Sequence, residues 1–253
     1  AGSDRSTGQR APYHDWNARI DYECYAANGS SRVLNKQDKI VRIVNNYSRM
    51  SFNFGPTLLA WMESAAPLSY RKVLDADRAS MERFGGHGSA MAQVYNHIIL
   101  PLAATQDRIT QIRWGIADFE HRFGRKPEGM WLAETAVDLE SLDLMAQHGV
   151  RFTILAPHQC ARVRAISTER DPEAPAWHNT PNASVDPTLP YLVRTAEGRS
   201  IAVFFYNGPA SRAVAFEGIL NDGGNFARHL LGGFSENGRP GQLSHIATDG
   251  ESY

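Results

Sequence analysis

The stretch KPEGMWLAETAVDLESLDLMAQHGVRFTILAP, which begins at residue 126, places the narrowest limits on how this chain folds. Residues 130–133 form a short apolar run typical of a buried strand. An apolar stripe of helical spacing follows between residues 137 and 145, and Gly149 stands where a left-handed helix cap is expected. A second strand-like run, VRFTILAP, comes next. A strand, a helix and another strand need a crossover connection, so the stretch predicts a βαβ unit with parallel strands.

Glu134 ends the first of these strands with a charge. Thr135 and Asp138 resemble a capping box, so we expect the helix to begin at Thr135. In parallel α/β folds, the carboxyl ends of strands bind ligands and carry catalytic side chains. A carboxylate before a helix is also stabilised by the helix dipole without any other role. The residue pattern alone gives these two interpretations of Glu134 equal weight.

The rest of the chain continues the alternation of strand-like and helix-like segments, which predicts an α/β fold with a parallel sheet. We expect a single domain over residues 1–253, with a polar, proline-rich excursion at 158–190 inside it. The remaining strands are expected at 39–44, 49–55, 244–249 and in a hairpin around Glu197–Gly198, and the remaining helices at 56–65, 68–84, 107–123 and 226–234. A barrel or open parallel sheet would bring the strand ends onto one rim, with Glu134 and Asp249 as neighbours.

Composition limits the partners. The net charge of −1, with basic residues spread along the chain, does not predict binding to nucleic acid or an anionic membrane. No apolar run reaches the roughly 20 residues of a spanning helix. Cys24 and Cys160 lie far apart and in no CxxC pattern, which indicates neither a disulfide framework nor a cysteine metal site and favours a cytoplasmic location. The chain starts without Met and stops just after a strand-like run, so we expect a piece of a longer protein. The oligomeric state is left open.

Three segments resemble the second, third and fourth sequence blocks of glycoside hydrolase family 57: GHGSAMAQVYNHIILPL, PEGMWLAETAVD and ATDGESY. Two others, SFNFGPTLL and FFYNGPASRAVAF, resemble a bacterial branch of that family. The resemblance runs from about residue 11 to residue 253. It implies a catalytic domain with a distorted (β/α)7 barrel, truncated at both ends, that lacks the first barrel strand and the C-terminal helical region.

The resemblance also implies an activity and a set of residues. The activity is that of a retaining glycosidase or 4-α-glucanotransferase-like enzyme that acts on an α-linked oligo- or polysaccharide and needs no cofactor. Glu134 matches the nucleophile and Asp249 the general acid/base, with Glu251 as the competing carboxylate. His97 matches the histidine of the second block. His87, at the start of that block, and His97 are expected to hydrogen-bond sugar hydroxyls. Trp131, in the third block, and Glu251 are also expected to bind substrate.

Asn207 is a candidate from its position, because a Gly-Pro turn after a strand presents it to the rim; a purely structural turn is as well supported. Two other functions remain open. A catalytically silent glycan-binding barrel would fit the missing first and fifth blocks. A metal-dependent, deacetylase-like hydrolase would use histidines near strand ends as ligands, although no HxH or HxxxH spacing is present. His158 and His178 are undecided.

Overall fold

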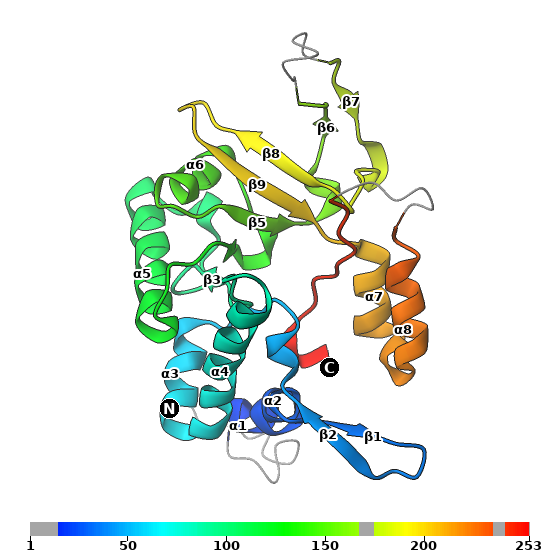
Figure 1. The fold of residues 1–253 in the computed structure, drawn as a ribbon. Coiled ribbons are helices and arrows are strands. Elements are labelled where there is room, and N and C mark those ends of the chain that lie inside the picture. The colour runs from blue at the N-terminus through cyan, green and yellow to red at the C-terminus, as the bar shows by residue number, and fades with distance from the viewer. Residues whose placement is uncertain (1–14, 167–174, 235–240, 253) are drawn as a thin grey trace, which may run out of the picture. The chain divides into compact units, whose positions relative to one another are not determined.

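The computed structural model describes residues 15–166, 175–234 and 241–252 of the chain (Figure 1). The described residues divide into two compact units. Unit 1 lies within Ala1–Ala136, His148–Val150 and Gly250–Tyr253, and unit 2 within Val137–Gln147 and Arg151–Asp249. The single-domain organisation stays a prediction.

Unit 1 consists mainly of helices around a short parallel sheet. Its main elements are α1 (Trp16–Ile20), a π-helical turn (Asp21–Tyr25), α2 (Ala26–Gly29), β1 (Ser31–Leu34), β2 (Ile40–Val44), α3 (Pro56–Ala65), α4 (Pro67–Arg83), β3 (Ala92–Gln93), α5 (Thr105–Phe123) and β4 (Met130–Trp131). β3 pairs with β4 in parallel, and Phe52 forms a parallel bridge to Ala90 on the other side. The core contains Met62, Ile112 and Met130, whose side chains are fully buried.

The helices of unit 1 follow signals in the sequence. Proline occupies the first turn of α3 and of α4, where the missing N–H has no helical partner to lose. α5 ends at Gly124, which adopts φ 68°, the left-handed conformation of a glycine cap. The helices predicted at 56–65, 68–84 and 107–123 are therefore confirmed within one or two residues.

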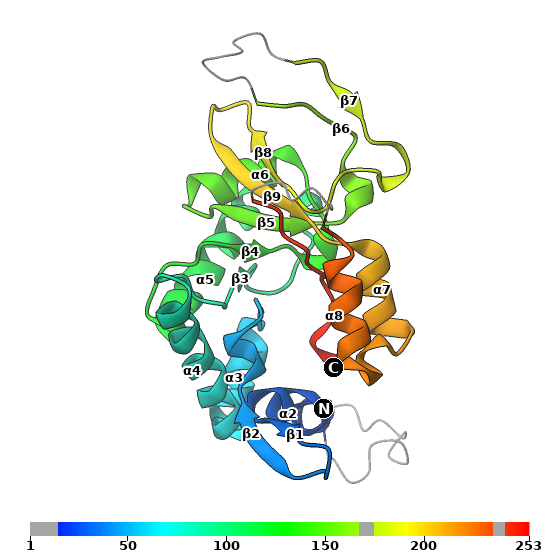
Figure 2. The ribbon, with the colours of Figure 1, turned by 45° about the vertical axis from the view of Figure 1, so that its right-hand side comes forward.

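Unit 2 is built on a three-stranded mixed sheet (Figure 2). Its elements are α6 (Leu139–Gln147), β5 (Phe152–Leu155), β6 (Arg162–Val163), β7 (His178–Asn179), β8 (Pro190–Arg194), β9 (Ser200–Phe205), α7 (Gly208–Phe216) and α8 (Gly223–Leu231). β9 lies between β5, which is parallel to it, and β8, which is antiparallel. Alternate residues of β9 are buried, and α6 packs against this strand.

The hairpin predicted around Gly198 is confirmed. β8 and β9 pair directly across it, Thr195 N–H donates to Arg199 O at 2.9 Å, and Gly198 adopts φ 78°. The α/β character is also confirmed, and two parallel pairs are present, β3 with β4 and β5 with β9. The two strands of the predicted βαβ unit, β4 and β5, do not pair with each other and belong to different sheets. The sheets of the described residues contain two, two, three and two strands, and none closes into a barrel. Among the same residues, no helix is long and apolar enough to cross a membrane.

Several predicted elements differ from the structure. The helix predicted at 226–234 begins and ends three residues earlier, as α8. The strand expected at 49–55 is reduced to the bridge at Phe52. Residues 39–44 do form a strand, β2, but it pairs antiparallel with β1 in an exposed ribbon. Residues 244–249 form no strand; within this segment Ala247 N–H donates to Ser211 Oγ at 3.1 Å. Within the 158–190 excursion, β6 and β7 pair antiparallel, and residues 167–174 lie outside the described residues.

A further difference concerns the helix after Glu134. α6 begins at Leu139, four residues later than predicted, and Asp138 caps it by accepting from Ser141 N–H at 2.8 Å. Thr135 adopts φ 54°, which is incompatible with a right-handed helix. The chain between β4 and α6 therefore contains a separate turn, and Glu134 lies within it.

Candidate functional site

Glu134 lies on a tight 3-10 turn, Ala133–Thr135, directly after β4. Glu134 adopts φ 54° and ψ 21°, and Thr135 also has φ 54°. Left-handed backbone at a non-glycine residue costs about 1–2 kcal/mol, and such residues gather at functional sites. The turn is held by Thr135 N–H to Leu132 O at 3.0 Å and Ala136 N–H to Ala133 O at 2.9 Å. This turn leaves the Glu134 side chain 79% exposed, although Leu132 and Ala133 just before it are buried.

His97 faces Glu134 from the neighbouring strand. It follows β3, adopts φ 54°, and donates its N–H to Val94 O at 3.1 Å. Because β3 and β4 are parallel neighbours, their carboxyl ends lie together. This places His97 Nε2 3.9 Å from Glu134 Oε1. The structure thus brings together the two residues that match the second and third sequence blocks, both on left-handed backbone.

The same strand ends carry polar and aromatic groups. Trp131, half-buried, is paired in register with Gln93 across β3 and β4. Gln93 is buried, and its Oε1 accepts from Asn53 Nδ2 at 2.7 Å. Trp131 ends strand β4, three residues before Glu134. A sugar contact by Trp131 stays a prediction.

The two carboxylates predicted near the end of the chain have different surroundings. Asp249 is exposed and belongs to unit 2, so its pairing with Glu134 stays a prediction. Glu251 belongs to unit 1, where its Oε1 accepts from Tyr25 Oη at 3.0 Å. Tyr25 is buried on the π-helical turn and packs edge-on against Phe54. Burial first, and then the charge of Glu251, raise the pKa of the Tyr25 phenol.

We expect Tyr25→Phe to lower the free energy of unfolding by about 1 kcal/mol at pH 7, because one hydrogen bond to a partly exposed carboxylate is lost. The pKa of Tyr25 is raised in the folded state. The contribution of Tyr25 to the free energy of unfolding is therefore complete below the pKa of the unfolded chain, about 10, and is lost as the pH rises above it. Urea unfolding of both proteins from pH 7 to 11 tests this. The difference between them should shrink above about pH 10; a constant difference would contradict the assignment.

Asn207 has a structural role. Its side-chain oxygen accepts from Ala210 N–H at 3.0 Å as the N-cap of α7, and its own N–H donates to His245 O at 3.0 Å. Contact of Asn207 with a sugar stays a prediction. No local sequence pattern indicates His245, a partly buried imidazole whose pKa is lowered by burial. Within the described residues, its Nε2 and the hydroxyl of Thr248 have no hydrogen-bond partner.

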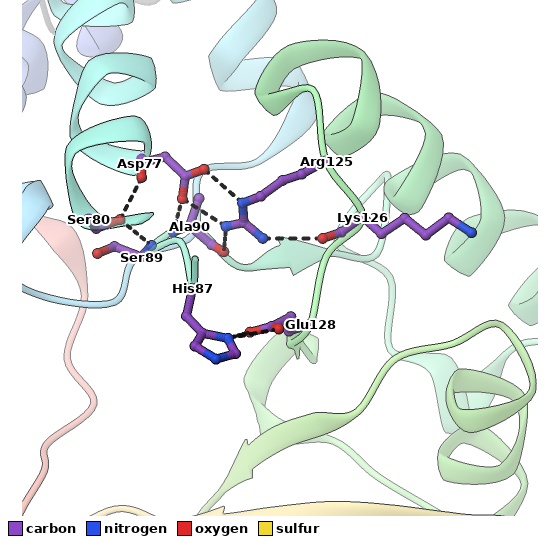
Figure 3. Close-up of polar contacts among 8 residues, drawn as sticks. All are labelled: Asp77, Ser80, His87, Ser89, Ala90, Arg125, Lys126 and Glu128. Carbon is purple, nitrogen blue, oxygen red and sulfur yellow. Dashed lines mark hydrogen bonds and ion pairs between the residues drawn. The ribbon is translucent and has the colours of Figure 1, made fainter. Parts of the chain in front are cut away.

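His87 lies at the opposite end of β3 from His97. It precedes the strand, is exposed, and its Nδ1 lies 2.9 Å from Glu128 Oε2 (Figure 3). Glu128 in turn precedes β4. Because catalytic groups of parallel sheets gather at the carboxyl ends of the strands, this placement does not support sugar binding by His87, which stays a prediction.

Next to the His87–Glu128 pair lies a buried ion pair that no local sequence pattern indicates. Arg125 Nη2 lies 2.7 Å from Asp77 Oδ1, and the Asp77 side chain is only 2% exposed. Asp77 Oδ1 accepts from Ala90 N–H at 2.8 Å, and Arg125 Nη2 donates to Ala90 O at 2.9 Å. Figure 3 shows both side chains meeting the main chain of Ala90. The pair therefore binds the main chain just before β3, much as a neighbouring strand would.

A glycine makes this arrangement possible. A Cβ at Gly88 would lie 2.3 Å from both Arg125 Nη2 and Asp77 Oδ1, closer than atoms approach. The glycines of GGHG indicate close backbone packing at this point. The side chains that approach Gly88, Asp77 and Arg125, lie 11 and 37 positions away, so the local pattern does not reveal them. Among residues 15–166, 175–234 and 241–252, no three His, Cys, Asp or Glu side chains form a group that could hold a metal ion.

Comparison with known proteins places this chain in a family. The sequence profile of glycosyl hydrolase family 57 matches residues 31–253. The chain belongs to this family. The match includes β3, β4, Glu134 and Asp249, so the resemblance of the three sequence blocks is confirmed at the level of the family.

Relatives of this family 57 chain are longer proteins. It is 26% identical over 107 residues to alpha-amylase 1 of Dictyoglomus thermophilum, a match that covers 42% of this chain and 15% of the amylase. It superposes on the 4-alpha-glucanotransferase of Thermococcus litoralis with a TM-score of 0.64 and 18% identity, over 94% of this chain and 31% of that one. It superposes on an exo-type maltose-forming amylase from Pyrococcus sp. ST04 with a TM-score of 0.58 and 16% identity, over 94% of this chain and 34% of the amylase. These superpositions show a shared fold.

Proposed function

We propose that this family 57 chain is the catalytic part of a retaining glycosidase or transglycosylase that acts on α-linked glucans. The observation that carries the proposal is the pair of Glu134 and His97, on strained turns at the carboxyl ends of adjacent parallel strands. The complete catalytic domain is proposed to be a distorted (β/α)7 barrel. Family membership and the amylase and glucanotransferase relatives support an α-glucan as substrate.

In the proposed reaction, the Glu134 carboxylate attacks the anomeric carbon and the bond to the leaving oxygen breaks. Asp249 donates a proton to that oxygen. Water or a sugar hydroxyl then attacks the glycosyl-enzyme ester, Asp249 takes its proton, and Glu134 is released. Retaining chemistry requires the two carboxyl groups to be about 5–5.5 Å apart. The tyrosine-bound Glu251 is the second candidate for the acid.

Two side chains are proposed to bind the substrate near the reacting carbon. His97, with half of its side chain exposed, lies beside the nucleophile and is able to hydrogen-bond a hydroxyl of the sugar under attack. Trp131 offers part of an indole surface, and apolar sugar faces stack on aromatic rings. Asn207 and His87 are left out of this set, because the first caps α7 and the second precedes β3.

A covalent label tests the proposal directly. The protein that contains this chain is incubated with maltooligosaccharides and with a 5-fluoro-α-glucosyl fluoride, which traps the glycosyl-enzyme of a retaining enzyme. We expect products of unchanged anomeric configuration and a labelled peptide modified at Glu134. Added glucose as acceptor separates transfer from hydrolysis.

Three results would contradict the proposal. The first is products of inverted configuration, and the second is a label on another residue. The third is tight glucan binding without any turnover, which would identify a glycan-binding protein instead. Loss of activity with a chelator, restored by a divalent metal, would favour the metal-dependent hydrolase.

A further inference from the structure

The short segment between β3 and His97 is fastened to the middle of helix α5. Tyr95 N–H donates to the main-chain oxygen of Gln111 at 3.2 Å, and Asn96 N–H donates to Gln111 Oε1 at 2.7 Å. Gln111 is 8% exposed. One buried residue of α5 therefore holds two successive peptide groups that lead directly into His97.

This helix approaches β3 unusually closely at the next turn. A Cβ at Gly115 would lie 2.1 Å from Gln93 O, so the helix and strand meet in the space that any other side chain would fill. Glycine within a helix costs about 1 kcal/mol relative to alanine. Gln111 and Gly115 are four positions apart and share one face of α5. The close contact at Gly115 thus sets the distance at which Gln111 reaches the segment before His97.

His97 needs such support because its own conformation is unfavourable. A non-glycine residue at φ 54° is retained only where the surrounding structure determines it. The fixed N–H of Asn96 sets the direction in which the chain enters His97. Val94 O accepts the His97 N–H and closes the turn. The direction of the imidazole toward Glu134 therefore depends on where Gln111 holds Asn96.

We propose that Gln111 is a positioning residue that sets the place of His97 relative to the nucleophile Glu134. The proposal rests on the proposed function for its kinetic consequence, but its geometric consequence can be measured without turnover. Gln111 also borders an open cavity of about 460 Å³, lined by Ile98, Ile99, Leu102, Ala103, Asp107 and Thr110 besides itself.

The kinetic test compares three variants of the protein that contains this chain. Gln111→Met keeps the length of the side chain and removes the acceptor, whereas Gln111→Glu keeps an acceptor oxygen. Gln106→Met, on an exposed position of the same helix, is the matched control. We expect Gln111→Met to lower kcat on maltooligosaccharides roughly 10- to 100-fold with little change in KM, since small misplacements near the reacting atoms have effects of this size. Gln111→Glu should recover most of the loss, and Gln106→Met should match the parent protein.

A second measurement is independent of the proposed activity. Glu134→Gln is expected to shift the imidazole NMR resonances of His97, because the two side chains face each other. That perturbation should be much smaller in the Gln111→Met background and unchanged in the Gln106→Met background. An equal perturbation in all backgrounds, with folded proteins verified by circular dichroism, overturns the positioning role.

The two measurements separate the possible failures. If the parent protein turns over no glucan while Gln111→Met weakens the coupling of His97 to Glu134, the proposed function fails and the positioning role stands. If the parent is active and Gln111→Met has the kcat of the parent, the positioning role fails and the proposed function stands.

Discussion

Glu134→Gln is expected to abolish the turnover of α-glucans, with a loss in kcat of at least about 10⁴-fold, because the group that forms the covalent intermediate is removed. An amide oxygen neither attacks the anomeric carbon effectively nor leaves from it. The stability of the protein should stay within about 0.5 kcal/mol, because the side chain is 79% exposed and has no hydrogen bond within the described residues. Initial rates on maltooligosaccharides and urea unfolding measure the two quantities.

Two controls make this result specific. Glu82→Gln changes another exposed carboxylate, on α4, and should leave kcat unchanged. Glu134→Ala in the presence of azide distinguishes a nucleophile from an acid. Azide should take the place of the carboxylate and give a glycosyl azide of inverted configuration. Full activity of Glu134→Gln would remove Glu134 from the mechanism.

Arg125→Met is expected to have the largest effect on stability, a loss of about 3 kcal/mol or more in the free energy of unfolding. The substitution leaves the Asp77 carboxylate, 2% exposed, without its compensating charge, and it removes the donor to Ala90 O. Burial of an uncompensated charge is unfavourable because the protein interior solvates it poorly. Urea unfolding at pH 7 measures the loss.

The neighbouring ion pair on α4 supplies the control. Arg78 and Asp75 are more than half exposed, so Arg78→Met should change stability by less than about 0.5 kcal/mol. The double variant Asp77→Asn/Arg125→Met should lose less than Arg125→Met alone, because no buried charge is left unpaired. Equal losses in Arg78→Met and Arg125→Met would show that the buried pair has no special contribution.

Much of the local structure could be predicted from the sequence. The bounds of α3, α4 and α5 follow from prolines, a capping glycine and apolar spacing, and the hairpin follows from Gly198. These signals act over a few residues. The prediction of a helix at Thr135 was wrong for the same reason, because the local pattern resembles a capping box while the strained turn at Glu134 displaces the helix start to Leu139.

The sequence by itself determined that Glu134 stands at the end of a buried strand, and its blocks indicated the family that the profile confirms. Only the tertiary structure decided which groups surround it. His97 reaches Glu134 because β3 and β4 are parallel and in register. Gln111 reaches the segment before His97 because Gly115 allows α5 to approach β3. Such contacts join residues tens of positions apart. They depend on strand register and helix packing, which no local sequence pattern specifies.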